Sequence, residues 1–126
     1  MTAEVDMELK KAFQELQVQM INTKNMAESI QLEMGQLKGA IMGMDLTQKK
    51  LQTLPAETRI YQVLGRAFHL QNTREMSEKI GQMMIENEKR IKAFENNKNY
   101  HENKLKESEK SLRELVETKK QKLTSK

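Results

Sequence analysis

Two long stretches of heptad-spaced apolar residues, interrupted once by a short segment of alternating pattern, constrain the fold of this chain more than any other feature. In the first stretch a 4-3 spacing runs from Leu9 to Leu51, and in the second it runs from Ile80 to Leu115. Such a spacing places one apolar stripe, called the seam below, along a helix, and a seam needs a partner helix. Because the chain turns back once, we expect the two seams to face each other in an antiparallel coiled coil.

The seam of the first helix is predicted at Leu9, Phe13, Leu16, Met20, Thr23, Ala27, Ile30, Met34, Leu37, Ile41, Met44, Gln48 and Leu51. The seam of the second is predicted at Ile80, Met84, Asn87, Ile91, Phe94, Lys98, His101, Leu105, Ser108, Leu112 and Leu115. Several of the second set are polar, which sacrifices stability for register or leaves the helices loosely paired.

The segment between the helices has the two-residue period of a β-hairpin. Pro55 ends the first helical pattern, and two short runs rich in β-branched and aromatic residues then flank Gly65. An isolated hairpin is marginal in water. Its apolar side chains would release on the order of 6–12 kcal/mol if buried; they are Tyr61, Val63, Phe68 and Leu70. The hairpin is therefore predicted to be an oligomerisation element that joins hairpins of other subunits.

These patterns predict a mainly α fold: a long antiparallel two-helix coiled coil with a single β-hairpin between the helices. The expected organisation is one domain over residues 1–126, with a helix at about 4–52, the hairpin at 58–71 and a helix at 73–122. Asn72 with Glu75 fits the cap of the second helix. A content of 37% hydrophobic and 4% aromatic residues is too lean for a thick globular core.

The sequence argues against catalysis. The absence of cysteine excludes disulfides, thiolate metal sites and cysteine nucleophiles. His69 and His101 fall far apart, and we find no phosphate-binding glycine loop, zinc spacing or calcium loop. We therefore expect no enzymatic activity, no cofactor and no metal site.

Neither a membrane nor a nucleic acid is expected as a partner. A membrane helix-pairing motif is imitated by Gly35, Gly39 and Gly43, which recur every four residues. Because Gln36 and Lys38 break its apolar context, we interpret the three glycines as a sign of close packing or flexibility. The longest low-polarity run is far short of a membrane span, and we expect a cytoplasmic protein.

The net charge of +4 has its excess in the second helix. Its last lysines, which favour the helix dipole, are interpreted as a solvated helix end; they are Lys119, Lys120, Lys122 and Lys126. This helix lacks the aromatic interleaving and recognition motif of a nucleic-acid binder.

The start of the first helix and the end of the second should meet, and together they form a candidate binding site. A coiled-coil end frays, and exposed apolar residues flanked by charge can hold non-native chains. The predicted client-binding residues are Val5, Met7, Leu9, Phe13, Leu16, Leu112, Leu115, Val116 and Leu123. A structural role in closing the seam would account for the other five residues, but it accounts less well for Val5, Met7, Val116 and Leu123.

The helix–hairpin–helix order, the opening from Val5 to Gln17 and the hairpin from Tyr61 to Gln71 resemble the β-class subunits of the prefoldin family. The similarity covers nearly the whole chain. Tyr61, Gly65, Arg66 and Phe68 carry most of its specificity, because heptad helices alone match many unrelated coiled coils. A single hairpin points to the β class.

The resemblance implies a subunit of a hetero-hexamer of α-class and β-class prefoldin subunits. Such a complex captures unfolded or nascent proteins, such as actin and tubulin, at its coiled-coil tips. It passes them to the cytosolic group II chaperonin without ATP. The residues implied for assembly are Ile60, Tyr61, Val63, Leu64, Gly65, Arg66, Phe68 and Leu70.

A coiled-coil scaffold or tether that binds one defined folded partner is the alternative. Client selectivity separates the two functions, because a holdase suppresses the aggregation of several unrelated unfolded proteins.

Overall fold

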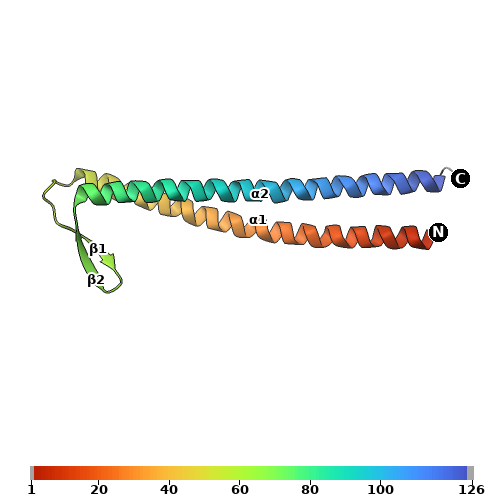
Figure 1. Ribbon diagram of the computed structural model, residues 1–126, viewed down its shortest axis with the longest axis horizontal. Helices are drawn as coiled ribbons and strands as arrows, with labels where there is room; N and C mark the ends of the chain where they lie inside the picture. Colours follow the sequence, from red (N-terminus) through yellow and green to blue (C-terminus); the bar gives the residue numbers. More distant parts are fainter. Residues whose placement is uncertain (1, 125–126) are drawn as a thin grey trace. The chain divides into compact units, whose positions relative to one another are not determined.

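The computed structural model describes the backbone of residues 2–124 and the side chains of residues 7–124. The elements follow the order α1 (Thr2–Thr53), β1 (Ile60–Leu64), β2 (Ala67–Gln71) and α2 (Thr73–Thr124), shown in Figure 1. The predicted fold class, two long helices with one antiparallel hairpin between them, is confirmed. Both helices extend slightly beyond their predicted ranges.

The chain divides into two compact units. The terminal unit comprises residues 1–31 and 95–126, and the hairpin unit comprises residues 32–94. Each unit pairs a stretch of α1 with a stretch of α2 and is described separately below.

The seam of α2 is confirmed throughout, because every predicted position from Ile80 to Leu115 is buried or half-buried. The same holds on α1 from Thr23 to Leu51. The apolar core is nonetheless thin. Among the described side chains, three hydrophobic ones are buried: Ile30 and Ile80 at 5% exposure and Met34 at 7%.

The predicted seam is wrong at two positions near the start of α1. Phe13 and Met20 are 52% and 44% exposed, whereas Ala12 and Gln19 are half-buried. On a helix, residues three and four positions from a seam residue flank it on either side, so either can face the partner. The heptad pattern selects the larger residues, but in the structure the smaller Ala12 and the amide of Gln19 face α2.

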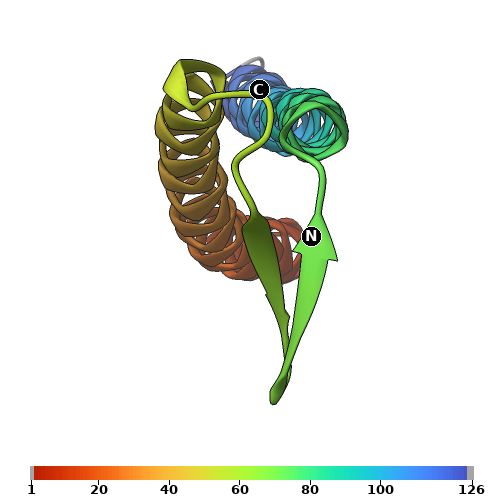
Figure 2. The ribbon, with the colours of Figure 1, turned by 90° about the vertical axis from the view of Figure 1, so that its left-hand side faces the viewer.

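The hairpin is a two-stranded antiparallel sheet. Figure 2 shows it in a view that runs along the helices. Tyr61 lies opposite Leu70, and Val63 lies opposite Phe68. Gly65 has a φ of 61° as the first of two turn residues, the position that type II′ turns reserve for glycine. This register, which the sequence left open, places Tyr61, Val63, Phe68 and Leu70 on one face.

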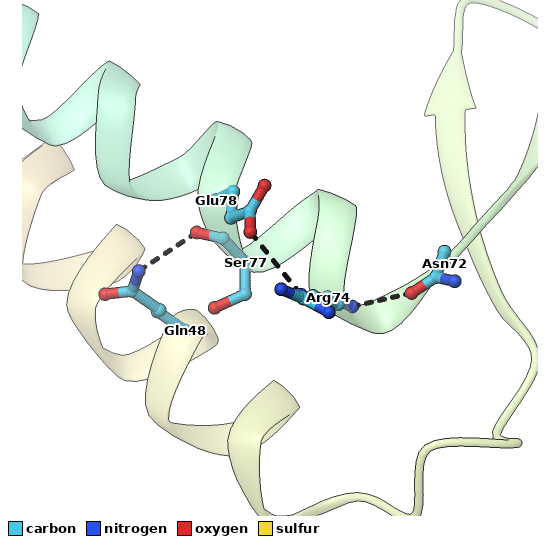
Figure 3. Close-up of polar contacts among 5 residues, drawn as sticks. All are labelled: Gln48, Asn72, Arg74, Ser77 and Glu78. Carbon is cyan, nitrogen blue, oxygen red and sulfur yellow. Dashed lines mark hydrogen bonds and ion pairs between the residues drawn. The ribbon is translucent and has the colours of Figure 1, made fainter.

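Local polar contacts end α1 and start α2. As predicted, α1 stops just before Pro55, whose carbonyl accepts a 3.0 Å hydrogen bond from the Thr58 amide. Asn72 Oδ1 accepts a 2.8 Å bond from the Arg74 amide and caps α2 (Figure 3). Gln48 Nε2 on α1 donates a 2.9 Å bond to the Ser77 carbonyl on α2 and ties the two helices together in the hairpin unit.

Two methionines on α1 provide a matched test of the seam. Met34 is 7% exposed and Met42 is 69% exposed. Met34→Ala should lower the free energy of unfolding by about 2 kcal/mol or more, because it leaves a cavity in the thin core. Met42→Ala should change it by less than about 0.5 kcal/mol. Denaturant unfolding followed by circular dichroism measures both, and equal effects would contradict the assigned seam.

Candidate functional site

One candidate surface is the apolar face of the hairpin. Its four side chains are Tyr61 (56% exposed), Val63 (64%), Phe68 (73%) and Leu70 (56%). Directly opposed pairs hold them together, Tyr61 with Leu70 and Val63 with Phe68. Four large apolar groups on one side of a two-stranded sheet form a surface suited to burial against another sheet.

The opposite face of the hairpin is mixed, with Gln62, His69 and Gln71 beside Ile60, Leu64 and Ala67. Gln71 Nε2 donates a 3.3 Å hydrogen bond to Gln62 Oε1 and lies 3.0 Å from His69 Nδ1. Ile60 is half-buried and Leu64 is exposed on this side. Of the residues that the resemblance implies for assembly, the structure thus puts four on the apolar face, two on the opposite, mixed face, and Gly65 and Arg66 in the turn.

A second candidate surface is a groove in the terminal unit, between the start of α1 and the end of α2. It has a volume of about 560 Å³. Its apolar lining consists of Phe13, Leu16, Met20, Leu112 and Val116, and its charged edge consists of Glu109, Arg113 and Glu117. We call these eight residues the terminal groove.

The shifted seam creates the terminal groove. Because Ala12 and Gln19 face α2, Phe13 and Met20 turn outward and meet Val116 along one side of the helix pair. The heptad pattern predicts Met20 only on the seam, so this lining residue is not among the predicted client-binding residues. Its spacing of seven residues from Phe13, which keeps both on one helix face, is the signal that could have identified it.

The other predicted client-binding residues are dispersed. Leu9 and Leu115 are half-buried on the seam. Met7 and Leu123 are 72% and 59% exposed and lie outside the groove lining. The side chain of Val5 lies outside the described residues.

An ion pair joins the two helices close to the groove. Lys119 occupies the next heptad position after Leu115 and is buried, at 9% exposure. Its Nζ donates a hydrogen bond to the carboxylate of Glu8 on α1. The prediction that the last lysines are solvated is therefore wrong for Lys119, because a helix that continues the seam carries its lysine stem into the interface. Lys126 lies outside the described residues.

The hydrogen bond from Lys119, and then its positive charge, lower the pKa of the Glu8 carboxyl below its ordinary value. Lys122 adds a smaller effect in the same direction. Glu8 is thus held in the charged form that the buried ammonium of Lys119 needs.

The described part of the chain also bears on the predictions about metal ligands, histidines and membrane spans. Within it, no group of three or more His, Cys, Asp or Glu residues is arranged to hold a metal ion. The rings of His101 and Tyr100 meet edge-on, 5.3 Å apart, on α2, whereas His69 lies on β2. Neither described helix is long and apolar enough to cross a membrane.

Comparison with known proteins gives one consistent family. Residues 14–119 match the prefoldin subunit family. Prefoldin subunit 1 of Danio rerio is 35% identical over 116 residues, covering 92% of this chain and 95% of that protein. The human prefoldin subunit 1 gives the same identity and coverage, and that of Arabidopsis thaliana is 30% identical over 84% of this chain and 83% of its own length.

A solved structure shows the same fold. The prefoldin beta subunit from Thermococcus strain KS-1 superposes with a TM-score of 0.59, covering 79% of this chain and 90% of that one, at 16% identity. The likeness therefore extends to the arrangement of helices and hairpin.

The ion pair between Glu8 and Lys119 predicts a specific dependence of stability on pH. Because the pKa of Glu8 is lower in the folded than in the unfolded chain, its charge stabilises the fold at neutral pH, and this contribution disappears as the pH falls through the lowered pKa. Glu8→Gln should therefore be less stable than wild type at pH 7, and the difference should shrink as the pH falls below 4.5, the ordinary value.

Thermal or denaturant unfolding at several pH values measures this difference. Glu33→Gln, which removes an exposed carboxylate from the same helix, controls for the change in net charge. A difference that does not vary with pH would contradict the role assigned to Glu8.

Proposed function

Because the chain belongs to the prefoldin subunit family, whose members are components of a chaperone, we propose that it captures unfolded or nascent proteins within a hetero-hexameric, ATP-independent prefoldin complex. In this proposal the chain is a β-class subunit beside α-class and β-class partners. The complex works in the cytoplasm and delivers clients such as actin and tubulin to the group II chaperonin.

The terminal groove is the observation that carries the client-binding part. A non-native chain exposes apolar side chains in no fixed arrangement, so a surface that holds many such chains must offer apolar area without demanding a sequence. Phe13 and Met20 provide that area, with Leu16, Leu112 and Val116 beside them. Met20 adds a flexible, polarizable side chain that adapts to different partners.

The charged edge of the groove supports the same use. Glu109, Arg113 and Glu117 carry both signs of charge next to the apolar floor. Such an edge keeps the empty groove hydrated and accepts charged residues that neighbour the apolar segments of a client. We propose that the remaining predicted residues extend this surface; they are Val5, Met7, Leu9, Leu115 and Leu123.

Assembly is assigned to the apolar face of the hairpin. Subunits of this family assemble with other prefoldin subunits, and the exposed face of Tyr61, Val63, Phe68 and Leu70 supports the hairpin as the contact. Burying that face supplies stability that an isolated two-stranded sheet lacks.

Charge on the apolar face should prevent assembly. Phe68→Asp introduces a carboxylate that would be desolvated in a sheet-to-sheet contact, and the chain should be lost from the complex. The matched control is His69→Asp, the next residue on β2, which faces the opposite side and should leave assembly intact. Co-expression with the other prefoldin subunits and native mass spectrometry of the purified complex measure both. Equal incorporation of the two variants would contradict the assignment.

Polar substitution in the terminal groove should weaken client capture without affecting assembly. The double variant Phe13→Ser/Met20→Ser removes the two exposed lining residues of α1 and should reduce aggregation suppression several-fold for at least two unrelated unfolded proteins. The matched control is Val18→Ser/Ile21→Ser, which removes apolar side chains that are 57% and 54% exposed on the same helix but outside the groove lining.

Light scattering with assembled wild-type and variant complexes measures the suppression. Equal activity of groove and control variants would place client binding elsewhere. Activity toward a single folded protein, with none toward unfolded ones, would favour the tether.

A further inference from the structure

The face of α1 opposite the seam is apolar and unoccupied over four turns. It consists of Leu32, Gly35, Gln36, Gly39, Met42, Gly43 and Leu46, and we call it the outer face. Its large residues Leu32, Met42 and Leu46 are 66%, 69% and 68% exposed. All seven residues are uncharged, in a chain with 32% charged residues. A solvent-facing helix surface in such a chain is normally charged, so the outer face has the character of a second packing surface.

Packing within the chain does not account for the three glycines of this face. A Cβ at Gly35, Gly39 or Gly43 would meet nothing within 4 Å, whereas a Cβ at Gly81 would lie 3.2 Å from Gln48 Nε2. Glycine is unfavourable inside a helix, so these positions weaken α1 without a gain inside the chain. Their missing side chains would let the backbone of another helix approach closely between the two leucines.

The outer face is symmetric about Gly39. Leu32 and Leu46 lie seven residues before and after it, and Gly35 and Gly43 lie four residues before and after it. In an antiparallel pair related by a two-fold axis at Gly39, each Leu32 would meet Leu46 of the other helix, and glycine would meet glycine. A self-complementary surface of this kind is what a two-fold dimer requires.

Charge selects the antiparallel arrangement. Glu28 and Lys50, both exposed, lie eleven residues before and after Gly39 and continue the line of the outer face along α1. An antiparallel copy brings Glu28 of each helix to Lys50 of the other, twice by symmetry. A parallel copy would bring glutamate to glutamate and lysine to lysine. The charges that bound the apolar face are therefore complementary in one orientation and repulsive in the other.

We propose that the outer face of α1 binds a second copy of this chain, antiparallel and centred on Gly39. The apolar part spans about 21 Å of helix, so it buries less than the roughly 800 Å² per partner of a standard stable interface. The contact is accordingly weak and forms where copies are concentrated. It uses a surface distinct from the hairpin and the terminal groove, and it stands or falls independently of client capture.

Disulfide cross-linking tests the register, because the chain contains no cysteine of its own. With Gly39→Cys the two thiols meet at the two-fold axis, and mild oxidation of the full-length chain should give a covalent dimer. With Gly35→Cys or Gly43→Cys alone, the like thiols lie about 12 Å apart along the helix, beyond disulfide reach, and little dimer should form. A mixture of Gly35→Cys and Gly43→Cys chains should cross-link to each other.

This pattern separates the proposal from other modes of self-association. Association through the hairpin does not bring the Gly39 positions together and would give no selective cross-link. A parallel pair would cross-link each of the three variants to itself. Either result would overturn the proposal, as would cross-linking at equal rates in every variant and mixture.

Charge exchange provides a second measurement on the Gly39→Cys background. Glu28→Lys or Lys50→Glu alone should slow cross-linking several-fold, and the two together in one chain should restore it, because opposite charges again face each other. Failure of the double variant to recover would contradict the assigned orientation. The same cross-links, formed by chains within assembled prefoldin complexes, would show that the contact also joins complexes.

Discussion

The pairing of one narrow apolar stripe on α1 with one on α2 is the interaction on which the rest of this structure depends. Each helix can bury a single face, and even on that face Ile30, Met34 and Ile80 are the described hydrophobic residues that become buried. Polar seam residues add hydrogen bonds between the helices. Gln48 Nε2 donates to the Ser77 carbonyl, and Lys98 Nζ donates a 3.0 Å bond to Gln31 Oε1. Both hydrogen bonds fix one residue of α1 beside one residue of α2 and so favour this register.

A core this thin leaves much of the apolar content outside it. Many of the exposed large apolar residues lie on the hairpin face, in the terminal groove or on the outer face of α1, whereas others, such as Val18, Ile21 and Ile85, lie outside these surfaces. The chain belongs to the prefoldin subunit family, whose members assemble with other subunits, and exposed apolar surfaces are consistent with such assembly.

The terminal groove and the buried Lys119 both lie where the start of α1 meets the end of α2. At Phe13 and Met20 the helix turns its smaller neighbours inward, and the displaced large side chains line the groove. At Lys119 the seam continues past the last leucine, and Glu8 supplies the charge that permits an ammonium there. The end of the coiled coil therefore combines an open apolar surface with an ion pair between its helices.

The sequence by itself determined the element order, the helix ends at Pro55 and Asn72, and the seam from Thr23 to Leu51 and along α2, because heptad spacing, proline and caps act over a few neighbouring residues. It also indicated the family through the hairpin. Tertiary structure alone decided the strand register, the exposure of Phe13 and Met20, and the partner of Lys119. Each of these depends on how one element meets another: residues three and four positions from a seam residue are equivalent on an isolated helix, and a lysine is solvated until a helix with a carboxylate packs against it.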